Sequence, residues 1–386
     1  MELKKYKLGE IGEIRMCKRI LKSETNPYFG IPFYKIGTFG KIADAFIDPL
    51  LYKHYKKSYS FPRKGDVLIS AAGTIGKSVI YNGEDAYFQD SNIVWIEHDQ
   101  SIVLNEFLYY LLNSIQWIPS KGSTIFRLYN DDIRNKEVFI PSIKEQRGIV
   151  SVLSSIDRKI ELNRTINQNL EAMAKHLYDY WFVQFDFPNE EGKPYKSSGG
   201  EMVWNEKIKR EIPIGWDNCT LKDFLTIKNG RDHKYLSEGL YPVYGSGGEM
   251  RRVNEYLYKG ESVLMPRKGT LNNIMYVDES FWTVDTMFYS EMKVLHCAKY
   301  IFFAIKDIDF TRWDSGTGVP SMTASTLYNL PMIKPNIDLL KRFDKAITPM
   351  FYKMKQIRVE YEVLTKQRDE LLPLLMNGQV SIPNCD

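Results

Sequence analysis

The sequence predicts an α+β protein with two repeated, β-rich mixed α/β globules separated by an antiparallel pair of long coiled-coil helices. Three observations predict this fold class: a heptad stripe in the middle of the chain, its recurrence near the C-terminus, and matching β-type segments in front of each stripe. The predicted order is a globule (residues 1–141), a helix (142–186), a linker (187–215), a second globule (216–335) and a second helix (336–380).

The central helix is predicted from its start signal and its apolar stripe. Ser142 and Glu145 have the spacing of a capping box, in which each side chain satisfies a backbone N–H of the other residue. Apolar residues then recur at steps of three and four, as in helices that supercoil against a partner. The residues predicted to pair are Ile149, Leu153, Ile156, Ile160, Asn163, Asn167, Leu170 and Leu177. At about 1.5 Å per residue the helix is about 60 Å long, too long for one small globule.

The same stripe recurs 194 positions later, so the partner helix is predicted to lie in the same chain. Its pairing residues are Phe343, Ile347, Met354, Ile357, Tyr361, Leu364 and Leu371. Asn377-Gly378 supplies a helix stop, and Pro349 and Pro373 predict kinks or a late start. Pairing must be antiparallel if the helices hold the globules at opposite ends. Alternatively, each helix is amphipathic by itself and packs only on its nearest globule.

Each globule consists of short β-type runs separated by Gly and Pro turns. The matching segments are 6–11 with 219–224, 31–34 with 240–244, 64–69 with 259–264, 73–75 with 269–271, and 89–91 with 284–286. The offset between the copies shrinks along the chain, so the first copy carries loop insertions, chiefly at residues 48–59. Residues 187–215 are rich in Gly, Pro, Ser and charge, which is typical of a linker.

The composition is that of a folded chain. Its 386 residues allow two domains, and 44% hydrophobic residues with 25 tyrosines argue against disorder. The net charge of +4 is compatible with nucleic-acid binding but does not argue for it. The four cysteines have no disulfide or metal spacing, and no apolar run approaches the length of about 18 residues that spans a membrane. We therefore expect a soluble, cytoplasmic protein without membrane contact.

No motif predicts catalysis or a metal site. Residues 71–78 resemble a phosphate-binding loop ending in Gly-Lys-Ser, but a predicted strand follows, not the helix that such a loop needs. Asn26-Pro27-Tyr28-Phe29 resembles an amino-methyltransferase motif, but it lacks one proline and no cofactor-binding glycine motif accompanies it. Both segments are interpreted as turns. The five histidines have no metal spacing, and we find no nuclease-type carboxylate pair and no nucleophile elbow.

Polar side chains that can contact nucleic acid gather in the predicted turns of both globules. Arg, Lys and Asn can read base edges, and cations and small hydroxyls can bind phosphates. A solvated surface charge is the simpler interpretation of any single residue, but equivalent placement in two repeats favours DNA contact. The candidates are Lys18, Arg19, Lys35, Lys121, Ser123, Arg127, Arg231, Lys234, Arg251, Arg252, Arg267, Lys268, Asn272, Arg312 and Thr317.

Three stretches carry a resemblance to a known family: IPSIKEQRGI at 140–149, Tyr180-Trp181-Phe182 at the end of the first helix, and IPIGW at 212–216. With these stretches the chain resembles the specificity subunits of type I restriction-modification enzymes along essentially its whole length. The start of the second helix, PNIDLL at 335–340, lacks the Glu-Gln of the family pattern, so we expect different contacts there.

The resemblance implies two target-recognition domains, each reading one half of a bipartite, asymmetric site in double-stranded DNA. It also implies partners: two methyltransferase subunits that carry S-adenosylmethionine and dock on the helices, and a motor-nuclease restriction subunit. This chain itself would bind no cofactor and have no active site. Two alternatives remain: a coiled-coil scaffold that presents two protein-binding globules without DNA binding, and a self-contained methyltransferase–specificity fusion.

Overall fold

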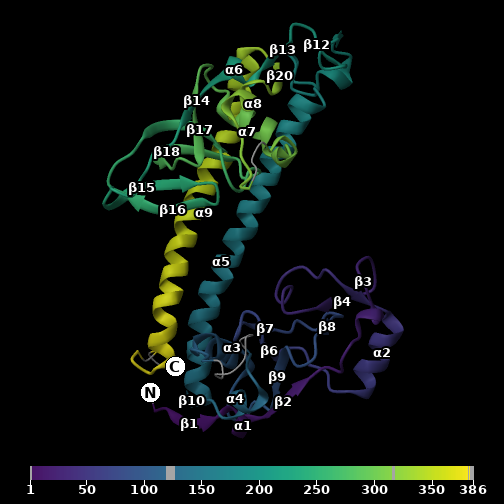
Figure 1. The fold of residues 1–386 in the computed structure, drawn as a ribbon, viewed down its shortest axis with the longest axis vertical. Helices are drawn as coiled ribbons and strands as arrows, with labels where there is room; N and C mark the ends of the chain where they lie inside the picture. The colour runs from purple at the N-terminus through teal and green to yellow at the C-terminus, as the bar shows by residue number, and fades with distance from the viewer. Residues whose placement is uncertain (1, 119–126, 315–317, 381, 383–386) are drawn as a thin grey trace. The chain divides into compact units, whose positions relative to one another are not determined.

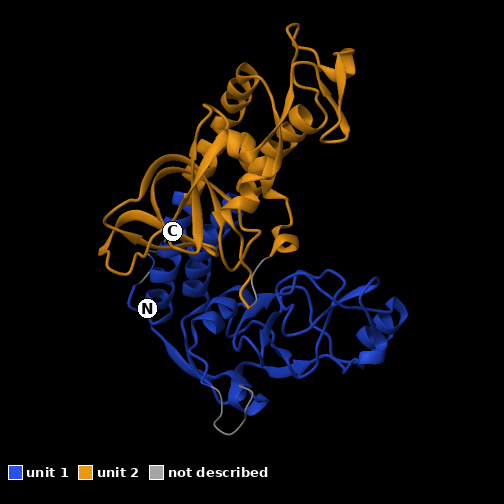
Figure 2. Cartoon of the chain, turned by 45° about the horizontal axis from the view of Figure 1, so that its top comes forward, with its two compact units in different colours: residues 1–164, 359–386 blue, residues 165–358 orange. Residues whose placement is uncertain are grey.

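The computed structural model describes residues 2–118, 127–314, 318–380 and 382. The chain divides into two compact units, one formed by residues 1–164 with 359–386 and the other by residues 165–358 (Figure 2). Both boundaries cut through long helices, α5 (Ile143–Tyr178) and α9 (Ile337–Met376), which are labelled in Figure 1. Each unit therefore contains one globule and part of both helices.

In its described residues, the first globule has two four-stranded sheets, with strand orders β2-β9-β6-β7 and β3-β5-β4-β8, and a separate pair β1-β10. Its elements are β1 (Lys4–Lys7), α1 (Leu8–Ile11), β2 (Glu13–Met16), β3 (Thr25–Asn26), β4 (Ile31–Tyr34), β5 (Phe46–Ile47), α2 (Pro49–Ser58), β6 (Val67–Ser70), β7 (Ser78–Ile80), β8 (Tyr87–Phe88), β9 (Ile93–Glu97), α3 (Asn105–Ser114), α4 (Asn130–Arg134) and β10 (Glu137–Ile140). Helix α3 packs on the first sheet and shares its core with the start of α5.

The second globule has one six-stranded sheet of order β14-β19-β17-β18-β15-β16 and a separate pair β13-β20, counted over its described residues. Its elements are β13 (Asp217–Thr220), α6 (Leu221–Phe224), β14 (Leu225–Asn229), β15 (Glu238–Gly245), β16 (Gly248–Val253), β17 (Tyr258–Pro266), β18 (Met275–Thr283), β19 (Met287–Met292), α7 (Ala298–Lys306), α8 (Ala324–Tyr328) and β20 (Pro331–Lys334). Helix α7 packs on β17 and β18, as α3 packs on β6 and β7.

The two globules share one topology, which confirms the predicted repeat. β1 pairs with β10 as β13 pairs with β20, both antiparallel. The run β2-β9-β6-β7 corresponds to β14-β19-β17-β18 with the same antiparallel pairings. A parallel contact follows in each copy, β4 with β8 and β15 with β18. One backbone plan thus serves both halves of the chain.

The insertion at residues 48–59 is a helix, not the loop that we expected from the sequence. Asp48 caps α2 by accepting hydrogen bonds from the N–H groups of Leu50 (2.7 Å) and Leu51 (3.2 Å), and Pro49 occupies the first helical position, where no N–H is needed. Tyr52 is buried and anchors the helix on the second sheet of the first globule. The second copy has the strand β16 at the corresponding place in the chain.

Helix α5 begins with the predicted capping box. The N–H of Ser142 donates to Glu145 Oε2 (3.0 Å), and the N–H of Glu145 donates to Ser142 Oγ (3.4 Å). The helix is α-helical to Tyr178 and continues as a π-helical turn over Asp179–Val183, so it is shorter than the segment 142–186. Helix α9 begins at Ile337 and continues through Pro349 and Pro373, so the predicted late start does not occur.

The two long helices pack against each other antiparallel within each unit. In the first unit, Arg164 of α5 donates to the hydroxyl of Tyr361 (2.8 Å), and Ile149 shares a core with Leu375. In the second unit, Phe343 of α9 packs on Phe182, with ring centroids 4.9 Å apart. Every residue predicted to pair is buried or half-buried.

The helix seam contains the two asparagines singled out from the sequence. Asn163 Nδ2 and Asn167 Oδ1 are buried and have no hydrogen-bond partner among the described residues. Unpaired buried amide groups cost stability but restrict the register of a helix pair.

Residues 187–215, which we expected to be a linker, are folded. They form a 3₁₀ turn at Lys196–Ser198 and an antiparallel hairpin of β11 (Met202–Asn205) and β12 (Arg210–Pro213). Phe187 stacks on Tyr195 (4.6 Å) and on Trp216 (5.3 Å), which ties the segment to the core of the second unit. The Gly- and Pro-rich composition reflects its turns and not flexibility.

Candidate nucleic-acid interface

In the first globule, three loops are joined by backbone hydrogen bonds. The N–H of Ala71, after β6, donates to Asn92 O (2.8 Å), and the N–H of Leu128 donates to Ala71 O (2.8 Å). Gln89, in the turn before β9, donates its N–H to Tyr34 O at the end of β4 (2.9 Å). We call this arrangement the first loop framework. It includes the Gly-Lys-Ser stretch, which lies in the turn between antiparallel strands β6 and β7, as predicted.

The second globule repeats these hydrogen bonds. The N–H of Arg267 donates to Thr286 O (2.8 Å), and the N–H of Met322 donates to Arg267 O (2.8 Å). Val284, before β19, donates its N–H to Tyr244 O (3.0 Å), as Gln89 does to Tyr34 in the first copy. This is the second loop framework. Sequence comparison of the copies found the matching segments, but not the hydrogen bonds that join them.

Equivalent positions of the two frameworks carry different side chains. Isolated β-bridges pair Ala72 with Arg127 in the first copy and Lys268 with Ser321 in the second. The first framework therefore presents Arg127 from the segment between α3 and α4, and the second presents Arg267 and Lys268 from the turn after β17. Since positively charged side chains bind phosphates and guanidinium groups also read base edges, the two frameworks would offer different contacts to a bound DNA.

Arg127 and Arg267 are both held half-buried against aromatic rings. The guanidinium of Arg127 lies 5.9 Å from the ring centre of Tyr129 and donates to Ser91 O (2.8 Å). The guanidinium of Arg267 lies 5.9 Å from the ring centre of Phe288. Such contacts hold a guanidinium in a defined place.

Three more candidates of the second globule join its framework or adjoin it. Arg231 donates its N–H to Thr283 O (2.8 Å), beside the turn that holds Arg267. Asn272 lies in the turn between β17 and β18, and its Nδ2 donates to Asp309 Oδ1 (3.1 Å). Arg312 forms an exposed ion pair with the same carboxyl group. Hydrogen bonds from Thr311 and Asn272 lower the pKa of Asp309 to about 2, so this carboxylate is charged. It would repel a DNA phosphate unless Arg312 neutralises its charge.

The other candidates of the second globule lie beside β15 and β16. Arg251 donates to the backbone oxygen of Leu236, and Arg252 forms an ion pair with Glu249. Lys234 is exposed in the loop after β14. The hydrogen bonds that define the second framework include none of these three residues.

In the first globule, Lys18 and Arg19 are exposed in the loop after β2, and Lys18 Nζ lies 5.1 Å from the ring centre of Tyr59. Lys35 follows β4 and forms an exposed ion pair with Asp44 (2.8 Å). Ion pairs of this kind contribute little, about 0 to 1 kcal/mol, so a phosphate can replace the carboxylate. Lys121, Ser123 and Thr317 lie outside the described residues.

Gln146 joins the first globule to α5, a role that the sequence motif did not reveal. Its side chain is fully buried, and its Nε2 donates to Ile102 O (2.8 Å) and Pro141 O (2.9 Å). Its Oε1 accepts from the N–H of Leu104 (2.8 Å). The Glu-Gln pair thus caps the helix and fixes the globule to it. The second helix start lacks this pair and is capped by Asn336, whose Oδ1 accepts from the N–H of Leu339 (2.8 Å).

In the part of the chain that the structure describes, no group of three or more His, Cys, Asp or Glu residues is arranged to hold a metal ion. No described helix is long and apolar enough to cross a membrane.

Each repeated globule carries an arginine on its loop framework and packs on a long helix, an arrangement compatible with two nucleic-acid-recognition domains in tandem. The family model for the type I restriction modification DNA specificity domain matches residues 1–172 and 213–349. The chain belongs to this family, and its function is that of a type I specificity subunit with two recognition domains.

Relatives agree with this assignment, and a solved structure has a similar fold. The chain is 48% identical over 181 residues to a Haemophilus influenzae protein named "Putative type I restriction enzyme specificity subunit S.HindORF215P", a match that covers 46% of each chain. It is 26% identical over 356 residues to the MjaIX specificity subunit of Methanocaldococcus jannaschii, covering 83% of this chain and 79% of that one. The fold is similar to a crystal structure of the S subunit from M. genitalium, with a TM-score of 0.63, 17% identity, and coverage of 97% and 96%.

Proposed function

We propose that each globule reads one half of a bipartite, asymmetric DNA site through its loop framework. One observation carries this proposal: the two frameworks have the same backbone hydrogen bonds but different side chains. These side chains are Arg127 in the first copy, and Arg267 and Lys268 in the second. A common backbone places both loop sets in the same way on a duplex, while different side chains select different bases.

Helices α5 and α9 serve, in this proposal, as the ruler between the half-sites and as the docking surface for two methyltransferase subunits. Both helices keep apolar side chains exposed beside their buried seam. Leu162 on α5 is 54% exposed, and Val359 and Val363 on α9 are 53% and 49% exposed. Exposed apolar side chains of this kind are typical of a surface that another protein covers.

The chemistry belongs, in this proposal, to the partner subunits. S-adenosylmethionine is bound by the methyltransferase subunits and DNA cleavage is carried out by the motor-nuclease subunit, while this chain is a non-catalytic, cytoplasmic subunit. The proposal rests on family membership and on the lack of a catalytic motif in the sequence.

Domain exchange tests the two-reader model. Residues 1–141 are replaced by the same region of a relative with another target, and the chimera is assembled with its methyltransferase subunits. Methylated sites are then mapped by sequencing. The expected result is a new sequence in one half-site, with the other half-site and the gap retained. A change in both halves would refute independent reading.

A further inference from the structure

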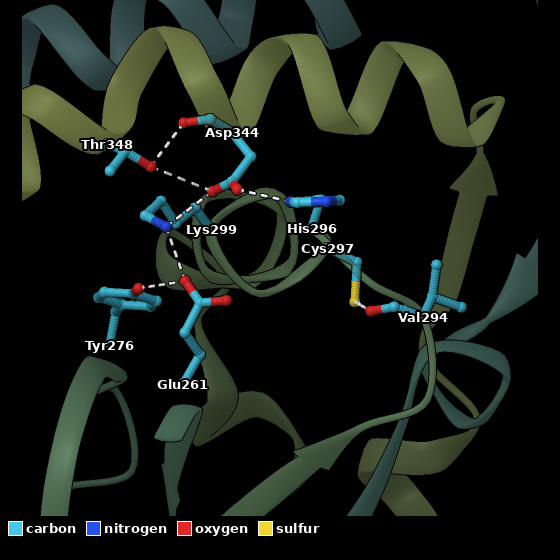
Figure 3. Close-up of polar contacts among 8 residues, drawn as sticks. All are labelled: Glu261, Tyr276, Val294, His296, Cys297, Lys299, Asp344 and Thr348. Atoms are coloured by element: carbon cyan, nitrogen blue, oxygen red, sulfur yellow. Dashed lines mark hydrogen bonds and ion pairs between the residues drawn. The ribbon is translucent and has the colours of Figure 1, made fainter.

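A cluster of charged side chains surrounds a buried lysine between the second globule and α9. Lys299, in the first turn of α7, has a side chain that is only 5% exposed. Its Nζ lies 2.6 Å from Glu261 Oε1 on β17 and 2.7 Å from Asp344 Oδ1 on α9 (Figure 3). One ammonium group therefore joins a strand, a helix of the globule and the long helix.

Neighbouring side chains complete the hydrogen bonding of this Lys299–Glu261–Asp344 triad. Tyr276 of β18 donates its hydroxyl to Glu261, and His296 Nδ1 lies 2.8 Å from Asp344 Oδ2 (Figure 3). Thr348, one turn further along α9, donates its hydroxyl to the backbone oxygen of Asp344 (2.7 Å), and this hydroxyl lies 3.4 Å from Asp344 Oδ1. Figure 3 shows these groups converging from β17, β18, α7 and α9. The charges are thus paired within a defined geometry.

The triad is absent from the first copy, so the common fold does not require it. Asp66 occupies the place of Glu261 and accepts a hydrogen bond from the N–H of Arg63 (2.7 Å). Val150 occupies the place of Asp344 at the repeat offset of the long helices. Buried ion pairs often stabilise a protein no more than apolar residues of the same volume. The triad therefore calls for an explanation other than stability.

Geometric restraint is such an explanation. Apolar packing is non-directional, so a globule that rests on a helix by apolar contacts alone can turn or slide slightly without a steep cost. A globule held by a buried ammonium that two carboxylates share cannot turn or slide in this way, because a small shift leaves the buried charge unpaired. The triad consequently holds α7 at one angle and one height on α9.

A second ionic contact links α9 to the recognition loops of the same unit. Arg358 Nη2 lies 3.1 Å from Glu279 Oε1 on β18, and Arg358 Nη1 lies 3.4 Å from the hydroxyl of Tyr244. Tyr244 is also the residue whose backbone oxygen holds Val284 in the second loop framework. The orientation of α9 is therefore coupled to the loops proposed to read DNA.

We propose that Lys299, Glu261 and Asp344 are positioning residues that fix the angle of the second recognition domain on α9 and thereby restrict the gap between half-sites that the protein accepts. This inference rests on the proposed function, because it assigns a role in measuring a bipartite site. None of the three residues needs to touch DNA. Their effect passes through α9, which is one continuous helix over Ile337–Met376.

The test is a neutral triad, Lys299→Met/Glu261→Gln/Asp344→Asn, in the full chain assembled with its methyltransferase subunits. The substrate is a DNA library in which both half-sites are fixed and the gap varies by one and two base pairs. The expected result is that both half-site sequences are kept. Methylation at gaps one base pair shorter or longer should rise about tenfold relative to methylation at the native gap. This change corresponds to a loss of about 1.4 kcal/mol of discrimination between gap lengths. Gap preference identical to the wild-type chain would overturn the proposal.

Two controls separate positioning from stability and from the proposed function. Lys209→Met/Glu206→Gln removes an exposed ion pair of the second unit and is expected to leave gap preference unchanged. If the neutral triad does not fold, the single variant Asp344→Asn, which keeps Lys299 paired with Glu261, is tested on the same library. Its methylation at non-native gaps is also expected to rise. A wild-type complex that methylates no bipartite site would refute the proposed function, whereas a fixed gap in wild type and variants alike would refute only this inference.

Discussion

Tyr110 donates its hydroxyl to Asp157 over 2.6 Å and so joins α3 of the first globule to α5. The other carboxylate oxygen of Asp157 lies 3.5 Å from Arg368 Nη1 on α9. The globule and both long helices of the first unit therefore meet at one carboxylate. In the second unit, Asp344 connects globule and helix in a comparable way, but with a lysine and a histidine as partners.

Tyr110→Phe should lower the free energy of unfolding by about 1.5 to 3 kcal/mol, because a hydrogen bond to a charged group is lost and the aromatic ring is kept. Urea denaturation of the full chain measures the change. Tyr109→Phe is the control, since this neighbouring tyrosine is half-buried, whereas Tyr110 is buried, and its hydroxyl has no hydrogen-bond partner among the described residues. Equal stability of both variants would show that the contact with Asp157 contributes little.

Arg127→Ala and Arg267→Ala should each weaken DNA binding and reduce the slope of log affinity against log salt by about one, if each arginine neutralises one phosphate. If an arginine reads a base instead, its removal should relax one position of its own half-site and cost about 1 to 3 kcal/mol of discrimination. Binding titrations at several salt concentrations with matched and mutated half-sites distinguish the two roles. Wild-type affinity and slope in either variant would show that this arginine does not contact DNA.

Lys121→Ala is expected from the sequence to have the same effect. Arg210→Ala is the control, because Arg210 lies outside both loop frameworks.

Four residues inserted after Asn167, with four more at the facing position after Ile357, should lengthen the helix pair by about 6 Å. At about 3.4 Å per base pair, the gap between half-sites should grow by one to two base pairs while both half-site sequences stay the same. Four residues slightly exceed one helical turn, and local unwinding can absorb this stutter. Methylation mapping measures the gap. An unchanged gap with full activity would show that α5 and α9 are not the ruler.

The Lys299–Glu261–Asp344 triad should make part of the stability of the second unit depend on pH. Burial acts against the charged form of Asp344, but hydrogen bonds from Lys299 and His296 outweigh it and hold the pKa of this carboxyl below its usual 3.8. Burial also opposes the charge of Lys299, yet its hydrogen bonds to Asp344 and Glu261 raise its pKa above the usual 10.5.

The sign follows from linkage. Because the pKa of Asp344 is lowered, this carboxylate stabilises the fold above pH 3.8, and the stabilisation is lost as the pH falls through the pKa of the folded state. Because the pKa of Lys299 is raised, this ammonium stabilises the fold below pH 10.5, and the stabilisation is lost as the pH rises through the pKa of the folded state. The melting temperature of wild type should therefore drop more steeply than that of the neutral triad variant below about pH 4 and above about pH 10.5. Parallel curves for both proteins over this range would contradict the assignment.

Local patterns in the sequence were enough to predict much of the architecture. The capping box of Ser142 and Glu145, the heptad stripe from Ile149 and its repeat from Phe343 depend on spacings of three and four residues along one helix. The internal repeat was visible because matching strands keep their order and their turn residues in both copies. The family resemblance followed from the same stretches.

The tertiary structure alone decided which distant residues meet. Gln146 looked like part of a helix start until the fold brought Ile102 and Leu104 to its amide group. Lys299 had no sign of being buried, because Glu261 and Asp344 lie 38 and 45 positions away in the chain. Residues 187–215 have the composition of a linker, yet stacking of Phe187 on Trp216 makes them part of a core. Spacing along the chain determines what one helix or strand can do, whereas hydrogen bonds and ion pairs between elements depend on how those elements pack, which no local pattern records.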